Sequence, residues 1–252
     1  MPLPVFVLNL PRDTDRRARV EADLARVGLQ GVFVPGVDGQ ALTAADWARY
    51  DGPRCRVRYG TDMLPGELGC YLGHERVLRR MLEGCHRVAL VLEDDARLSE
   101  DLRPLLEVLL SGPPSWQVVR LSSMRPRQVA EAVAGRRPDL PLTEGRGLFR
   151  LKTHVLGAQG YVVTAEGARG LLACGRRIVL PWDHMMDRFW ENGIVPYVVW
   201  PPPVRHGTEL PSCIGARDPR RRYESGVVTL WRRRMNRWRD GLGKRWYTLR
   251  HP

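Results

Sequence analysis

Three consecutive acids, Glu93, Asp94 and Asp95, are the residues in this sequence best suited to chemistry. They directly follow an uninterrupted apolar run over residues 88–92. Adjacent carboxylates repel by about 1 kcal/mol or more at contact distance even in high dielectric. A bound cation relieves that repulsion, and carboxylate oxygens suit Mg²⁺ and Mn²⁺, which commonly bridge protein acids to phosphates. We therefore expect Asp94 and Asp95 to bind such an ion. The alternative is a solvated acidic turn that caps a helix beginning near Asp101.

The elements that must position these acids follow an alternation of strands and helices. Residues 3–10 predict a buried strand, residues 13–27 a helix and residues 32–34 a second strand, which together indicate a βαβ unit. A continuous apolar run such as 88–92 is typical of a central strand of a parallel sheet. Open α/β sheets bind their ligands at the carboxyl ends of such strands. The pattern also predicts helices over 66–83, 102–110, 165–172 and 183–191, and strands over 117–121 and 160–163.

Length and composition predict one globular domain with appendages. The chain has 252 residues, of which 43% are hydrophobic and 27% charged. The longest uncharged stretch, residues 193–204, contains four prolines and is too short to cross a bilayer. The first residues do not resemble a secretory signal. Five scattered cysteines without C-x-x-C spacing argue against a disulfide framework and a structural zinc site, so we expect a cytoplasmic protein.

Most of the net charge of +12 lies at the C-terminal end. From Arg217 onwards twelve Lys or Arg residues stand against three acids, which leaves only +3 for the rest of the chain. We divide the chain into a domain over 1–215 and a basic tail over 216–252. Five apolar residues of the tail recur at spacings of four, four, three and four: Val227, Trp231, Met235, Trp238 and Leu242.

This spacing predicts a basic amphipathic helix with three open interpretations. A tryptophan stripe flanked by arginines is typical of a segment that lies on an anionic membrane surface, here residues 217–250. The stripe could instead dock on the protein's own body. Arginine interleaved with tryptophan also fits single-stranded nucleic acid. The last interpretation does not explain why a buried strand should end in three acids, so we expect no nucleic-acid partner.

Several sequence blocks occur in the order found in a known family. They are the opening segment from Val7 to Arg17, the Leu64 to His74 stretch Leu-Pro-Gly-Glu-Leu-Gly-Cys-Tyr-Leu-Gly-His, Leu92-Glu93-Asp94-Asp95, the Gly157 to Ala168 block, Pro181-Trp182-Asp183 and Ser212-Cys213-Ile214. Together they resemble glycosyltransferase family 25, which includes bacterial lipooligosaccharide galactosyltransferases and collagen galactosyltransferases. The resemblance implies a GT-A-like α/β fold, with a mixed sheet flanked by helices.

The resemblance also implies roles for residues on the metal and acceptor sides of a site. It implies transfer of a hexose from a nucleotide sugar, usually UDP-galactose, with inversion at the anomeric carbon. His206 resembles in position a histidine that completes the metal shell of some GT-A enzymes, although it could be a plain surface residue. Inversion needs a base, for which Asp183 is the candidate and Asp187 the alternative. Asp183 could also simply N-cap its helix.

On the donor side, the family blocks suggest contacts from the end of the first strand and from the acid triplet. Arg12, Arg16 and Arg17 follow the first strand, and arginine suits phosphate geometry. These arginines could equally form a solvated helical turn. His74 lies on the apolar face of its helix, so it is either a core histidine or a donor contact. The expected donor-binding residues are Asn9, Leu10, Arg12, Arg16, His74, Glu93 and Asp94.

These observations lead us to expect an inverting hexosyltransferase that depends on Mn²⁺ or Mg²⁺. Its expected donor is a UDP-sugar, and its acceptor a glycan or glycolipid such as lipooligosaccharide. The basic tail would hold it peripherally on the inner face of the cytoplasmic membrane. The alternatives are a nucleic-acid-binding protein that acts through its tail, and an inactive homologue that binds sugar nucleotide without turnover.

Overall fold

The computed structural model describes residues 3–112, 115–143, 145–150, 153–207, 215 and 227–250, with the side chains of the last segment described from Trp231 onwards. The Ser212-Cys213-Ile214 block and the tail arginines from 217 to 222 lie outside these residues. In the described part of the chain, no helix combines the length and apolar composition that crossing a membrane requires.

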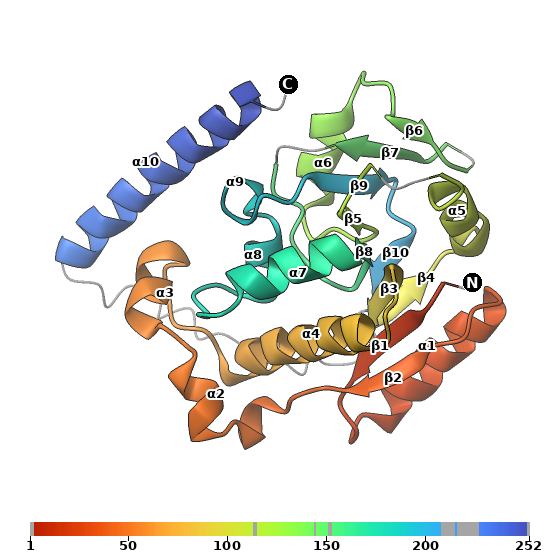
Figure 1. Ribbon diagram of the computed structural model, residues 1–252, viewed down its shortest axis with the longest axis horizontal. Coiled ribbons are helices and arrows are strands. Elements are labelled where there is room, and N and C mark those ends of the chain that lie inside the picture. The colour runs from red at the N-terminus through yellow and green to blue at the C-terminus, as the bar shows by residue number, and fades with distance from the viewer. Residues whose placement is uncertain are drawn as a thin grey trace.

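One mixed sheet of eight strands organises the molecule (Figure 1). β1 (Val5–Asn9) runs parallel to both β2 (Val32–Pro35) and β3 (Val88–Glu93), whereas β8 (Gly160–Thr164) is antiparallel to its neighbours β3 and β5 (Val118–Arg120). β3 is therefore central, as expected, and the sheet is mixed, as the family resemblance implied. In spatial order the strands are β2, β1, β3, β8, β5, β9 (Pro196–Trp200), β7 (Gly147–Arg150) and β6 (Leu140–Pro141).

Helices cover both faces of the sheet, which confirms the predicted α/β class. Alternate residues of β1 enter different cores: Phe6 and Leu8 pack with α4 (Pro65–Glu83) and α7 (Ala165–Cys174), and Val5 and Val7 with α1 (Thr14–Arg26) and α5 (Leu102–Leu109). A strand buried on both faces has no solvent side, which is why its sequence is continuously apolar. The remaining helices are η1 (Gly39–Ala41), α2 (Ala44–Ala48), α3 (Gly52–Arg58), α6 (Pro126–Val133), α8 (Trp182–Met186), α9 (Phe189–Asn192) and α10 (Val227–Arg250).

The predicted helix over 183–191 is wrong as a single element. Two short helices, α8 and α9, occupy this stretch, and Arg188 between them has a non-helical backbone with φ −91° and ψ 54°. The Asp187 carboxylate accepts hydrogen bonds from the backbone N–H groups of Val155 and Leu156, at 2.8 Å each. The chain therefore turns where a buried acid is anchored to a neighbouring loop.

A two-stranded sheet lies beside the acid triplet. β4 (Ala96–Leu98) pairs antiparallel with β10 (Val204–His206), with His206 opposite Ala96. The backbone N–H of Gly207 also donates to the carbonyl of Asp95, at 2.8 Å. This pairing brings a residue more than a hundred positions away to the acids that follow β3.

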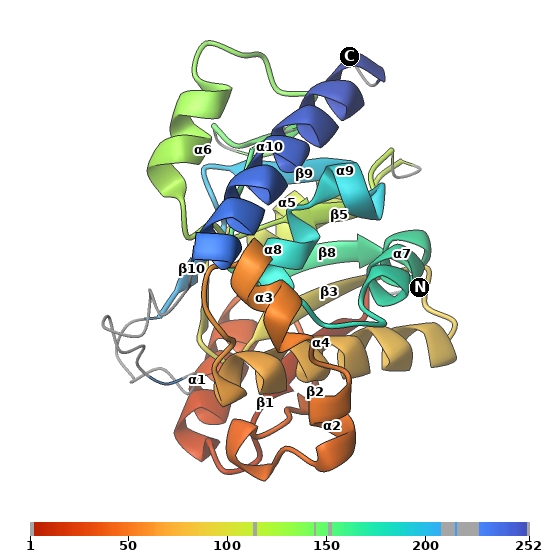
Figure 2. The same cartoon turned by 90° about the vertical axis from the view of Figure 1, so that its left-hand side faces the viewer.

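The tail forms a helix, as the stripe predicted, but the stripe faces away from the body. α10 packs against α3 and α9 (Figure 2). Its docked face includes Asp240, which pairs with Arg188, and Tyr247, whose ring lies 4.9 Å from that of Phe189. The described residues of the stripe are exposed, so the interpretation that the stripe docks on the body is wrong.

Candidate active site

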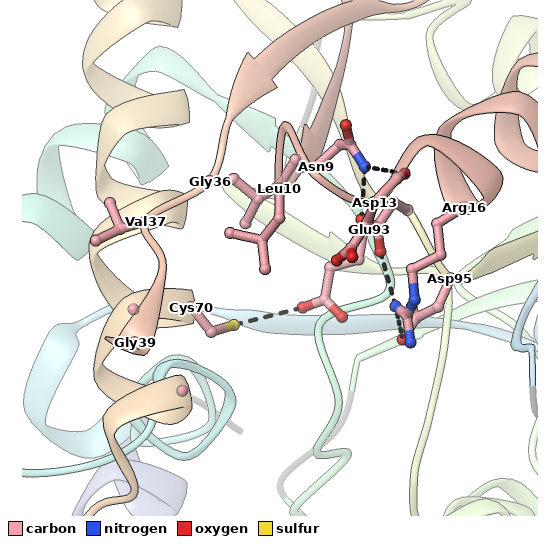
Figure 3. A pocket seen from close by; sticks show the side chains of 14 residues that line it. Asn9, Leu10, Asp13, Arg16, Gly36, Val37, Gly39, Cys70, Glu93 and Asp95 are labelled. Atoms are coloured by element: carbon pink, nitrogen blue, oxygen red, sulfur yellow. Dashed lines mark hydrogen bonds and ion pairs between the residues drawn. The ribbon is translucent and has the colours of Figure 1, made fainter. Parts of the chain in front are cut away.

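A pocket opens at the carboxyl ends of β1 and β3 (Figure 3). Its volume is about 600 Å³ when its open mouth is counted. The lining comes from the end of β1, the start of α1, the loop after β2, the first turns of α4 and the acid triplet. These residues are Leu8, Asn9, Leu10, Asp13, Arg16, Gly36, Val37, Gly39, Gly66, Gly69, Cys70, Glu93, Asp94 and Asp95.

Strand register brings Asn9 and Asp94 together. Leu8 of β1 pairs with Glu93 of β3, so the next residue of each strand meets the other at the pocket. The Asn9 Nδ2 donates to Asp94 Oδ2 at 2.9 Å, and the Arg16 Nη1 donates to Asp94 Oδ1 at 2.9 Å. Burial raises the pKa of Asp94, and these two donors oppose the shift. Both Asp94 oxygens are thus already engaged within the protein.

Asp95 has a carboxylate oxygen that is left without a partner in the described part of the chain. Its Oδ2 lies 3.2 Å from the Nδ1 of His206 and 3.6 Å from Arg16. Its Oδ1 is buried and has no hydrogen-bond partner in the described residues, an arrangement that proteins rarely leave without a ligand. The hydrogen bond to Asp95 raises the pKa of His206. His206 ends a strand, where the sequence suggested a loop.

Glu93 connects the pocket to a buried aromatic cluster. The Nε2 of His74 lies 3.0 Å from Glu93 Oε1, and its Nδ1 lies 3.1 Å from the Tyr161 hydroxyl. The His74 ring stacks on Trp182, with ring planes 2° apart. His74 is fully buried and is not a lining residue, so it faces the pocket only through Glu93.

Cys70 also contacts Glu93, with its Sγ 3.8 Å from Oε1. Burial raises the pKa of the Cys70 thiol well above its usual value, and the Glu93 carboxylate adds to this shift. Burial likewise raises the pKa of Glu93, and the His74 hydrogen bond lowers it. The low-dielectric surroundings thus disfavour the charged form of both groups.

Arg12, another expected donor contact, is not among the lining residues. It forms ion pairs with Asp38 and, at 3.9 Å, with Asp13. Its side chain is about half exposed. Arg12 therefore matches the alternative of a solvated turn. Arg16 lies four residues further along the chain, on α1, and pairs with Asp94.

Asp183 lies in the first turn of α8, after Pro181, which occupies the N-cap position. Its Oδ2 accepts from the N–H of Gly157 at 2.9 Å, and its Oδ1 from the N–H of His184 at 2.8 Å. Its charge is close enough to contribute to the raised pKa of Glu93, after burial and Asp95. The carboxylate thus ties the loop before β8 to α8 near the acids, in place of the predicted N-cap.

The buried pair of Arg120 and Asp187 was not predicted from the sequence. Arg120 Nη1 donates to Asp187 Oδ1 at 3.1 Å, and each side chain is 4% exposed. Burial raises the pKa of Asp187, and Arg120 opposes the shift. Asp187 also holds Leu156, which adopts a rare positive φ of 50°. Asp187 is therefore buried within this anchor, whereas Asp183 is only partly buried, which leaves Asp183 as the better placed candidate base.

Close backbone approach explains two glycines in the pocket wall. A Cβ on Gly69 would lie 2.3 Å from the carbonyl oxygen of Val37, and one on Gly39 2.5 Å from the nitrogen of Gly66. The loop after β2 therefore packs directly on the first turns of α4. Glycines at these positions were visible in the sequence, but their partners were not.

Comparison with known proteins gives a consistent family. Residues 3–186 match "Glycosyltransferase family 25 (LPS biosynthesis protein)". Over 208 residues the chain is 29% identical to the human inactive glycosyltransferase 25 family member 3, with 75% of this chain and 32% of that protein covered. It is 27% identical over 201 residues to procollagen galactosyltransferase 1 of Danio rerio, with 75% and 31% covered. The chain thus spans about a third of the length of these relatives.

Among solved structures, one to which the chain was matched is a glycosyltransferase involved in the glycosylation of the major capsid of PBCV-1. The identity is 9% and the TM-score 0.35, and the alignment covers 69% of this chain and 66% of that one.

Proposed function

We propose that this chain, which belongs to glycosyltransferase family 25, transfers a hexose from a UDP-sugar to a glycan or glycolipid acceptor with inversion at the anomeric carbon. UDP-galactose is the expected donor and lipooligosaccharide the expected class of acceptor. The relatives include both galactosyltransferases and proteins named inactive, so the activity has to be argued from this chain's own pocket.

The charge of the pocket favours a donor that enters with a cation. Four carboxylates line it, from Asp13, Glu93, Asp94 and Asp95, against the single guanidinium of Arg16. A diphosphate alone would meet net repulsion there. The observation that carries the proposal is the buried Oδ1 of Asp95 in this acidic lining, which has no hydrogen-bond partner among the residues that the structure describes.

The residues present fit a hard divalent ion such as Mn²⁺ or Mg²⁺. Asp95 offers its Oδ1 and His206 its imidazole. Asp94 accepts hydrogen bonds from Asn9 and Arg16 and supports Asp95 from the neighbouring position. When bound, the ion would supply positive charge against the negative charge that builds on the departing diphosphate.

The remaining chemistry belongs to the chain itself. Arg16 lies at the pocket and can add a guanidinium to the phosphate side. The attacking acceptor hydroxyl must lose a proton, and the Asp183 carboxylate is the group that we assign to accept it. Its hydrogen bonds to Gly157 and His184 fix its position for this role. Positive charge developing on the sugar is met by the same acidic lining.

Measuring UDP release from UDP-galactose with lipooligosaccharide and Mn²⁺ tests the proposal. We expect Asp95→Asn to lose at least about a hundredfold in kcat/KM, as for the loss of one preorganised electrostatic group. Glu107→Gln removes an exposed acid that pairs with Arg103 far from the pocket and is the matched control. Equal Mn²⁺-dependent turnover in wild type and Asp95→Asn would contradict the assignment. Nucleotide binding without turnover by wild type would identify an inactive homologue.

We further propose that α10 lies on an anionic membrane surface, on the inner face of the cytoplasmic membrane. Trp231, Trp238 and Trp246 are 62%, 63% and 56% exposed, and they share one face of α10 opposite the docked Asp240 and Tyr247. Exposed arginines flank this face on both sides, namely Arg232, Arg234, Arg237, Arg239 and Arg245.

This composition matches the chemistry of an interfacial helix. Tryptophan suits the boundary between headgroups and acyl chains, and each base near anionic lipid adds about 1 kcal/mol. Because the opposite face of α10 holds the body, this helix would keep the folded domain at the membrane, where lipid-linked acceptors are anchored. A lipid-linked acceptor therefore agrees with the exposed stripe.

Co-sedimentation with vesicles that contain anionic lipid tests this surface. We expect a Trp231→Ser, Trp238→Ser double variant to lose at least about tenfold in vesicle affinity, because two buried rings are removed from the interface. Trp47→Ser removes a tryptophan on α2 that is 39% exposed and is the control. Unchanged vesicle binding, or tighter binding of single-stranded DNA than of vesicles, would contradict the membrane assignment.

A further inference from the structure

A second group of metal-ligating side chains lies beside the acid pair. Cys70 and His74 are four residues apart on α4, so they occupy the same face of the helix. Glu93 ends the adjacent strand β3, and its carboxylate points toward Cys70 (Figure 3) and lies 3.0 Å from His74 Nε2. One ligand atom from each residue lies within 4.8 Å of the ligand atoms of the other two. The fold of the chain itself places these three atoms together.

Two of the three distances between the ligand atoms are close to those of a tetrahedral zinc site, and the third is at most 4.8 Å. Zinc bonds of about 2.0–2.1 Å to nitrogen and oxygen and about 2.3 Å to sulfur place O and N roughly 3.4 Å apart and S and O roughly 3.6 Å apart at tetrahedral angles. The observed distances are 3.0 Å from Glu93 Oε1 to His74 Nε2 and 3.8 Å from Glu93 Oε1 to Cys70 Sγ. Both lie within a few tenths of an ångström of the expected values.

We propose that Cys70, His74 and Glu93 form a binding site for Zn²⁺, distinct from the oxygen-rich site at Asp95. A thiolate, an imidazole and a carboxylate form a softer donor set than carboxylates alone and therefore select zinc over Mn²⁺ or Mg²⁺. Binding forms the S–Zn bond and releases the thiol proton to solvent.

The surroundings of His74 resemble the outer shell of a metal site. A metal-bound histidine normally uses its other ring nitrogen in a hydrogen bond that fixes the ring. His74 Nδ1 lies 3.1 Å from the Tyr161 hydroxyl, and the ring stacks on Trp182. Nε2 is thereby directed toward Glu93 before any ion arrives, so little reorganisation is required.

The fourth position of the tetrahedron faces the pocket. Cys70 and Glu93 line the pocket, whereas His74 lies behind them. Three protein ligands with one open position are typical of zinc sites that exchange a ligand with solvent or substrate. The bound zinc would then lie at the wall of the donor pocket. Zinc and the donor would compete for the space in this pocket.

Cobalt and zinc titrations of the full-length protein test the site without an activity assay. Co²⁺ bound through a thiolate gives a sulfur-to-metal charge-transfer absorption, which we expect in wild type at one equivalent and which Zn²⁺ should abolish. Cys70→Ser should lose the band and weaken zinc binding by at least about tenfold, since even losing an outer-shell partner costs this much. Cys174→Ser, an exposed cysteine at the end of α7, should retain both.

Alkylation of the wild-type protein provides a readout that needs no variant. We expect Zn²⁺ to protect Cys70 from iodoacetamide, as mapped by mass spectrometry, while Cys174 reacts equally with and without zinc. A band that persists in Cys70→Ser, or alkylation of Cys70 that zinc does not slow, would overturn the proposal. Because neither measurement involves sugar transfer, their failure would leave the transferase proposal standing, and the reverse also holds.

Discussion

At the scale of single residues, the three neighbouring acids have different surroundings despite their similar side chains. Glu93 faces an imidazole and a thiol, and Asp94 accepts hydrogen bonds from an amide and a guanidinium. Asp95 has one buried oxygen that no group of the described residues hydrogen-bonds. The direction of each side chain at the end of β3 decides which partners it meets. The sequence predicted an acidic site here, whereas the division of labour within it depends on Asn9, Arg16, His74 and Cys70.

Glu191 gives a pH-dependent prediction at the same scale. Although burial raises its pKa, hydrogen bonds from Arg188 and Arg58 bring the pKa down to about 2. A depressed carboxyl pKa contributes stability above the ordinary value near 4.5, and this is lost as pH falls toward 2.

We expect Glu191→Gln to lower the free energy of unfolding at pH 7, because it removes the charge that pairs with Arg188 and Arg58. Solvent screens this partly exposed group, so the loss should be only roughly 1 kcal/mol. The difference from wild type should shrink as pH falls below 4.5, as measured by urea denaturation across the range. A difference that stays constant down to the lowest accessible pH would show that charge is not the cause. Glu21→Gln, which removes an exposed i,i+4 partner of Arg17, is the control.

At the scale of elements, α10 shows how one helix serves two surfaces. Its docked face is anchored by Asp240 and Tyr247, and its opposite face carries the exposed tryptophans. Gly241 and Gly243 would normally weaken a helix, yet α10 continues through both to Arg250. Gly243 lies against the indole of Trp190, where a Cβ would approach Cδ1 to 2.7 Å, whereas a Cβ on Gly241 would meet nothing within 4 Å.

The two glycines therefore predict opposite effects of the same substitution. We expect Gly241→Ala to stabilise the protein by about 0.5–1 kcal/mol through helix propensity. Gly243→Ala should instead destabilise it by about 1–3 kcal/mol, because the added methyl group overpacks the contact with Trp190. Thermal unfolding of both variants checks the sign, and stabilisation by Gly243→Ala would contradict the docking of α10 described above.

At the scale of the whole molecule, the tail helix is part of the folded body. α10 contacts α3 near the start of the chain and α9 near the end of the main domain. It covers Phe189, which is 1% exposed, and it supplies Asp240 to the buried Arg188. The boundary predicted between residues 215 and 216 separates two segments that differ in composition but share a packed interface.

Truncation at this boundary measures what the interface contributes. We expect a chain ending at residue 215 to have a free energy of unfolding lower by at least about 1.5–3 kcal/mol, the contribution of burying one aromatic side chain. Urea denaturation measures this difference. Arg188 keeps Glu191 as a partner, so the body should remain folded. Binding to anionic vesicles should disappear in the same variant. Equal stability of the two chains would mean that α10 does not dock in solution.

Much of the fold followed from local sequence patterns. The continuous apolar run before Glu93 predicted a doubly covered strand, and the spacing of the tail's apolar residues predicted an amphipathic helix, although not whether its stripe would be docked or exposed. Such patterns are readable because each residue's burial repeats with the period of its own helix or strand. They also predicted that the acids after β3 would lie at a ligand-binding edge, where the pocket is found.

Tertiary structure alone decided which distant residues meet at that edge. Register between β1 and β3 brings Asn9 to Asp94, β10 brings His206 to Asp95, and the end of β3 brings Glu93 to Cys70 and His74. The buried Arg120–Asp187 pair and the break between α8 and α9 arise in the same way. Local periodicity carries no information about pairing across long sequence separations, because those contacts are selected by the packing of the complete chain.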